Sequence, residues 1–184
     1  MQDRYETTSK LMSLLLRHNP KAGGLSLDDA GWVDVDALLQ ALSAKGHELD
    51  RAQLDDLVAS NAKSRFAFDQ TGTRIRAVQG HSIDVSLGYD PMVPPDRLYH
   101  GTVARFVSSI RTHGLISKGR THVHLSQDVD TAVVVGKRRG MAVVLTIDTA
   151  AMHVDGIEFY LADNGVWLTR AVAARYIIDW GDTL

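Results

Sequence analysis

Apolar residues near the start of the chain follow the period of an α-helix. Residues 7–18 hold four leucines and one methionine at helical spacing, so they predict a first helix that ends before Pro20. A second helix is predicted over 34–44. A third begins at Asp50, because Gln53 three residues later completes a capping box.

The period then changes to that of short strands. Residues 65–68 and 74–78 alternate apolar and polar side chains around a glycine-containing turn, which predicts a β-hairpin. Three helices followed by a hairpin are typical of a winged helix. We therefore expect residues 1–88 to form a winged-helix-like lobe.

Three of the four prolines fall within 89–96, which predicts a linker. After it, short strands and a few helices alternate, and residues 97–184 are expected to form a compact second lobe of α+β class. Its predicted strands are 97–100, 121–125, 142–147, 157–161 and 166–169, its helices are 103–112 and 128–135, and its closing segment is 171–180.

The net charge of −2 hides an uneven distribution. Residues 28–56 carry eight acids and two basic residues, whereas residues 63–76 carry four basic residues and one acid. Most charge runs are solvated surfaces, but the basic hairpin offers a local site for a phosphate.

Several function classes are excluded by what the chain lacks. It has no cysteine, so disulfides, thiolate catalysis and Cys-rich zinc sites are absent. It has no apolar run near the roughly 20 residues that span a bilayer, and residues 1–10 are polar. We expect a cytoplasmic protein with no membrane contact.

Three separate segments carry cations suited to phosphate. The pair Arg17 and His18 ends the first helix, where cations also complement the helix dipole. Lys63 and Arg65 precede and open the hairpin, and Arg138 lies in a glycine-flanked run of three basic residues. Arginine suits phosphate because its planar fork donates two parallel hydrogen bonds. Each segment alone also fits a solvated surface.

Polar residues gather where the hairpin ends. Arg76, Gln79, His81 and Ser82 surround Gly80, which allows a close approach of the backbone to a ligand. All four side chains can bond phosphate or ribose oxygens, so we interpret this segment as a candidate RNA-binding element.

Two more segments are candidates for a second ligand. His100, Gly101 and Thr102 are predicted at a strand end just before a helix, where backbone N–H groups favour anions. The predicted strand 121–125 and the residue after it include His124 and Ser126. His122 and His124 share one strand face, but no convincing third metal ligand accompanies them, so no metal is predicted.

The common nucleotide motifs are missing: there is no GxxxxGK[ST] loop and no GxGxxG fingerprint. No serine lies in a nucleophile-elbow motif either. P-loop kinases, Rossmann dehydrogenases and serine hydrolases of that type are disfavoured.

The order of the segments is far more specific than any one of them. From about residue 8 to residue 178 the chain resembles the RNA 2′-phosphotransferase family (KptA-like enzymes). The segments that carry the resemblance are SKLMSLLLRHNP, GWVDVDALL, RF, IRAVQGHS, LYHGT, GL…HVHLS, VGKRRG, VVL and NGVWLT.

The resemblance implies an N-terminal winged-helix-like RNA lobe, a C-terminal ADP-ribosyltransferase-like lobe and a cleft between them. It implies an essential set, matched here by Arg17, His18, Arg65 and Arg138. Val166 stands where many protein-modifying ADP-ribosyltransferases carry a glutamate, which argues against protein modification.

The resemblance also implies NAD as co-substrate, with no metal. NAD contacts fall on a second set of residues: His100, Gly101, Thr102, His124 and Ser126. The substrate is an RNA with an internal 2′-phosphate, as in tRNA splicing. It is processed through 2′-phospho-ADP-ribosylated RNA to 2′-OH RNA, nicotinamide and ADP-ribose 1″,2″-cyclic phosphate. No obligate protein partner is implied.

Three other functions stay open at this point. One is an ADP-ribosyltransferase acting on protein or on nucleic-acid phosphate ends, and another is a non-catalytic winged-helix protein that binds nucleic acid. The third helix disfavours the latter, because it has Asp50, Asp55 and Asp56 against Arg51 alone. A phosphatase that works without NAD is the third.

Overall fold

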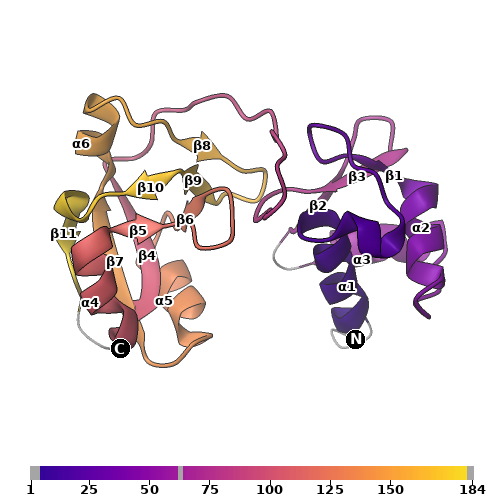
Figure 1. Cartoon of the computed structure of the whole chain (residues 1–184), viewed down its shortest axis with the longest axis horizontal. Helices are drawn as coiled ribbons and strands as arrows, with labels where there is room; N and C mark the ends of the chain where they lie inside the picture. Colours follow the sequence, from indigo (N-terminus) through magenta and orange to yellow (C-terminus); the bar gives the residue numbers. More distant parts are fainter. Residues whose placement is uncertain (1–4, 62–63, 182–184) are drawn as a thin grey trace. The chain divides into compact units, whose positions relative to one another are not determined.

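The computed structural model describes residues 5–61 and 64–181. The chain divides into two compact units, Met1–Gly88 and Tyr89–Leu184 (Figure 1). Both mix helices with small antiparallel sheets, so the chain belongs to the α+β class.

The first unit contains three helices and a small sheet. In chain order its elements are α1 (Glu6–Arg17), η1 (Pro20–Gly23), β1 (Val33–Asp34), α2 (Val35–Ser43), α3 (Arg51–Ala59), β2 (Phe66–Phe68) and β3 (Arg74–Ala77). The sheet has the order β1-β3-β2 with both pairs antiparallel. The three helices and the hairpin were predicted, but β1 was not, since two residues leave no periodic pattern.

Local sequence signals explain where the helices of this unit begin. The Asp50 side chain accepts a hydrogen bond from Gln53 N at 2.8 Å, and Gln53 returns one to Asp50 N at 3.0 Å. The predicted capping box is therefore confirmed. Asp34 caps α2 in the same way by accepting from Asp36 N and Ala37 N.

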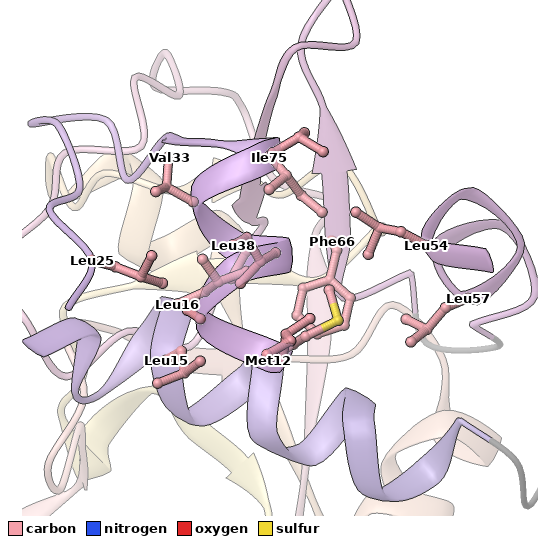
Figure 2. Packing of buried hydrophobic residues seen from close by; sticks show 14 residues of the cluster. Met12, Leu15, Leu16, Leu25, Val33, Leu38, Leu54, Leu57, Phe66 and Ile75 are labelled. Atoms are coloured by element: carbon pink, nitrogen blue, oxygen red, sulfur yellow. The ribbon is translucent and has the colours of Figure 1, made fainter. Parts of the chain in front are cut away.

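The helices meet the hairpin in one apolar core (Figure 2). Met12, Leu15 and Leu16 of α1 are fully buried. They pack in the same cluster as Leu38 of α2 and Phe66 of β2. Burying a large apolar side chain contributes about 1.5–3 kcal/mol. The end of α1, where Arg17 lies, is therefore tied to the hairpin.

The second unit contains three small sheets. Its elements are β4 (Arg97–Val103), α4 (Ala104–His113), β5 (Leu115–Ile116), β6 (Val123–Leu125), α5 (Val129–Lys137), β7 (Ala142–Asp148), α6 (Thr149–Val154), β8 (Tyr160–Leu161), β9 (Trp167–Thr169), β10 (Ala171–Val172), η2 (Ala174–Tyr176) and β11 (Ile177–Asp179). The sheet orders are β11-β7-β4, β6-β9-β8 and β10-β5. A bridge between Tyr99 and Ser126 connects β4 to the end of β6.

Two details of the second unit differ from the sequence prediction. The strand expected over 97–100 continues to Val103, so Gly101 and Thr102 lie inside β4, paired with Val144 and Val143. They do not lie at a helix start, because α4 begins at Ala104. The short helix α6, capped by Asp148, was not expected at all.

Residues 89–96, expected as a linker, make backbone hydrogen bonds inside the second unit. Met92 N donates to Phe159 O at 2.8 Å, and Asp96 O accepts from Thr149 N at 3.1 Å. These bonds fasten the segment to α6 and to the residues that follow it.

Helix α5 approaches β4 so closely that glycine is required at two contacts. A Cβ at Gly101 would lie 1.8 Å from Ala132 O, and one at Gly136 would lie 2.9 Å from Thr102 O. Both obstacles are backbone atoms, which cannot rotate away. The two glycines therefore set the distance between β4 and the helix that ends beside Arg138.

No helix in the described part of the chain is both long and apolar enough to span a membrane.

Replacing Gly101 by alanine is expected to destabilise the second unit. Overpacking a well-filled contact costs about 1–3 kcal/mol, and this clash is with backbone, so we expect the upper end of that range. Gly119→Ala is the matched control, because a Cβ there meets nothing within 4 Å and only its positive φ of 68° is strained. Thermal unfolding measures both. Equal losses in the two variants would contradict the close approach.

Candidate functional site

The first group of candidate residues begins at the end of α1. Arg17, its last residue, is only 8% exposed. Its Nη2 donates to Arg65 O at 3.3 Å, and its guanidinium lies 6.0 Å from the centre of the Phe66 ring. The predicted Arg17 and Arg65 are thus brought together although they are 48 residues apart.

His18 joins this group through the segment that follows the hairpin. Its Nδ1 lies 2.8 Å from Ser82 Oγ, while Ser82 N donates to Arg17 O at 2.9 Å. Two bonds therefore attach Ser82 to consecutive residues of the α1 terminus. His18 and Ser82 are both exposed, so they face solvent where a ligand can reach them.

Arg65 and Arg76 are positioned by their own partners. Arg65 Nη1 donates to Asn61 Oδ1 at 3.5 Å, and Asn61 Nδ2 donates to Ser9 Oγ at 3.1 Å. Arg76 Nη1 donates to Leu87 O at 2.8 Å.

The Arg76 guanidinium also lies 4.5 Å from the centre of the Trp32 ring, at cation–π distance. Gln79 is half-buried. Lys63, predicted to bind phosphate, lies outside the described residues.

His81 is the buried member of the group, with 1% of its surface exposed. Burial and, after it, the charges of Arg17, His18 and Arg76 together lower its pKa to about 4. The charges of these three residues therefore all reach the His81 ring. We call Arg17, His18, Arg65, Arg76, His81 and Ser82 the cation cluster of the first unit.

The second group of candidates surrounds β4 and β6. His100 Nδ1 donates to His124 O at 3.0 Å, which fixes the tautomer of a neutral His100 with Nε2 as an acceptor. Burial lowers the pKa of His100, the bond to the His124 carbonyl opposes this, and Arg139 lowers the pKa further. His100 is therefore held uncharged at neutral pH.

Three arginines gather beside these histidines. Arg120 Nη1 lies 3.3 Å from His124 Nδ1. The pKa of Arg120 is lowered by burial and then by the charges of Arg139 and Arg138. Sequence reasoning named Arg138 but missed Arg120. The only available signal was a basic residue after Gly119, four positions before His124.

The other predicted residues of the second unit are placed by the backbone. Ser126 N donates to Tyr99 O at 2.7 Å, which holds Ser126 beside β4. Thr102 is 8% exposed and Gly101 lies against α5, so neither extends a side chain into solvent. In the described residues no group of three or more His, Cys, Asp or Glu is arranged to hold a metal ion.

The depressed pKa of His81 makes stability depend on pH. An unfolded histidine binds protons below about 6.5, whereas folded His81 binds them only near 4. Stability is therefore full above about pH 6.5 and is lost as pH falls toward 4, by at most about 3 kcal/mol. Chemical denaturation of the protein and of His81→Asn between pH 7.5 and 4.5 measures this. The same acid-side loss in both proteins would contradict it.

The sequence of the chain matches one protein family over most of its length. The profile of the family described as RNA 2′-phosphotransferase, Tpt1 / KptA family, matches residues 3–171. The chain is 49% identical over 172 residues to a probable RNA 2′-phosphotransferase of Flavobacterium johnsoniae, covering 94% of both chains.

Relatives from distant bacteria are equally similar. A probable RNA 2′-phosphotransferase of Pseudomonas paraeruginosa is 51% identical over 94% of this chain and 95% of its own. One of Streptomyces coelicolor is 51% identical over 96% of both chains. With the cation cluster and this full-length similarity together, the chain belongs to the RNA 2′-phosphotransferase, Tpt1 / KptA family.

Proposed function

We propose that the protein removes an internal 2′-phosphate from RNA by transferring it to NAD. The observation that carries this proposal is the cation cluster of the first unit. It gathers Arg17, Arg65 and Arg76, with His18 at its surface, from segments far apart in the chain. The planar guanidinium groups of arginines, together with a histidine, can bind a phosphate without the help of a metal ion.

In this proposal the first unit is a winged-helix-like RNA lobe. Arg17 and Arg65 offset the charge of the 2′-phosphate, since preorganised donors stabilise charge that develops during transfer. His18 stands exposed at the end of α1, with Ser82 fixing its ring at Nδ1, so Nε2 is the atom that donates to a phosphate oxygen or moves a proton. Ser82, Gln79, Arg76 and Lys63 add contacts to the RNA.

The second unit is proposed as the ADP-ribosyltransferase-like lobe that binds NAD. His100 of β4 is bonded to His124 O of β6, Ser126 is bridged to Tyr99 of β4, and Gly101 and Thr102 follow His100 within β4. Arg120 and Arg138 supply the positive charge that a pyrophosphate requires. The chemistry of these residues fits NAD. Among the described residues, no group of three or more His, Cys, Asp or Glu could hold a metal ion.

NAD supplies the ribose carbon that accepts the phosphate, and nicotinamide leaves. The ribose 2″-hydroxyl would then attack the phosphorus and lose its proton, while the RNA 2′-oxygen leaves and takes up a proton; the products are 2′-OH RNA and ADP-ribose 1″,2″-cyclic phosphate. We also propose Arg138 as a catalytic residue of the transfer. Val166 in place of a glutamate supports a phosphate rather than a protein side chain as acceptor.

The requirement for NAD and for the cluster can be tested together. An RNA oligonucleotide with one internal 2′-phosphate is incubated with the protein in EDTA, with and without NAD. We expect phosphate loss only with NAD, and a fall of about 10²–10³ in rate for Arg65→Ala, since one preorganised donor typically contributes that much.

Arg51→Ala is the matched control, because Arg51 is an exposed arginine of the same unit, paired with Asp55. It should keep the parent rate. Phosphate loss without NAD would instead identify a phosphatase, and no turnover by folded protein would refute the transfer.

Arg120 separates NAD binding from RNA binding. A charge-assisted hydrogen bond is worth about 1.5–3 kcal/mol, so Arg120→Ala should weaken NAD binding by tenfold or more while the affinity for 2′-phosphorylated RNA stays unchanged. Calorimetric titration with each ligand measures this. Arg111→Ala is the control, because Arg111 stacks on Trp180, 4.1 Å from the ring centre. Unchanged NAD affinity in Arg120→Ala would exclude Arg120 from the site.

A further inference from the structure

His81 is the most deeply buried residue of the cation cluster. Only 1% of its surface is exposed, and neither ring nitrogen has a hydrogen-bond partner among the described residues. A neutral imidazole carries one donor and one acceptor, and buried polar atoms are normally satisfied. An unsatisfied buried ring at a binding site therefore calls for an explanation.

The position of His81 couples it to residues that face the ligand. The next residue, Ser82, donates its backbone N–H to Arg17 O and contacts His18 Nδ1 through its hydroxyl. His81 therefore directly precedes a residue that contacts both Arg17 and His18.

The charges around the ring all have one sign. Arg17 and His18 act on it from the end of α1, and Arg76 acts on it from β3. The Nε2 of His81 would lie 3.6 Å from a Cβ at Gly31, a position that Val85 and Leu87 also surround. Without a bound anion, a proton on the buried His81 ring would add a positive charge beside Arg17, His18 and Arg76.

An anion bound to the cation cluster favours protonation of His81. Burial is the main reason why His81 stays neutral, and a phosphate dianion that binds Arg17 and His18 offsets the charges that add to it. An opposite charge within about 4–6 Å typically moves a pKa by about 1–3, which is enough to bring His81, at about 4 in the free protein, into the range of mildly acidic solutions.

We infer that His81 is a positioning residue that is neutral in the empty site and takes up one proton when a tetrahedral dianion binds the cation cluster. The inference rests on the proposed function, because it assigns the RNA 2′-phosphate to this cluster. The proton comes from solvent and stays on the His81 ring, so no bond of the substrate changes in this step. His81⁺ then adds charge behind the phosphate without contacting it.

The direct test observes the ring itself in the unaltered full-length protein. Nitrogen-15 NMR of histidine-labelled protein at pH 6 reports whether each imidazole is neutral or charged. Sulfate is the first probe, because it is a tetrahedral dianion that exchanges no proton in this range. RNA with one internal 2′-phosphate, without NAD, is the second. We expect the His81 signal to change from neutral to charged with either probe.

Two variants give an independent readout. Calorimetric titration with the RNA at pH 6, in buffers of different ionisation enthalpy, measures how many protons are taken up on binding. His81→Asn should take up fewer protons than the parent, by up to one. In the parent, the KM for 2′-phosphorylated RNA should fall as the pH falls, by up to about tenfold per pH unit for one linked proton, and this pH dependence should be smaller in His81→Asn. His47→Asn, altered in the same unit at a residue bonded to Thr8, should behave as the parent.

The outcomes distinguish the two claims. Binding of sulfate and RNA with His81 neutral throughout, or equal proton uptake by parent and His81→Asn, overturns the inference and leaves the proposed function standing. Absence of any binding of 2′-phosphorylated RNA, with the protein folded, overturns both.

Discussion

The burial of one face of α1 is the constraint on which the candidate site depends. The cluster gathers cations that repel one another, and two unit charges 4 Å apart repel by about 4 kcal/mol at an effective dielectric constant of 20. Met12, Leu15 and Leu16 are fully buried on the same helix and together contribute about 5–9 kcal/mol. These apolar contacts oppose the repulsion, and Arg17 on the same helix stays buried at 8% exposure. Backbone carbonyls complete the arrangement, since Arg65 O accepts from Arg17 and Arg17 O accepts from Ser82.

In the second unit, the close approach of two backbone segments positions the candidate residues. Gly101 and Gly136 let α5 lie directly on β4, and Arg138 follows at the helix end. The same strand carries His100, whose bond to His124 O joins the sheet of β4 to that of β6. Gly101 and Gly136 thus serve the close packing of α5 on β4 and not the flexibility of a loop.

The sequence predicted most of what depends on local chemistry. The capping box of Asp50 and Gln53, the hairpin and the long helices follow from short-range patterns, and the structure confirms them. The full length of β4 was missed because glycine and threonine before a helix look like a strand end, although pairing with β7 continues through them. Arg120 and the burial of His81 depend on contacts between distant segments, which no local pattern encodes. The α6 helix is too short for a period to appear.

The identity of the released product tests the central claim most directly. NAD labelled in its adenosine half is mixed with excess 2′-phosphorylated RNA and the full-length protein, and the small molecules are resolved by mass. The account predicts one ADP-ribose 1″,2″-cyclic phosphate and one dephosphorylated RNA for each nicotinamide released. Nicotinamide release with the label left on RNA or protein, or with free ADP-ribose and intact 2′-phosphate, would contradict it.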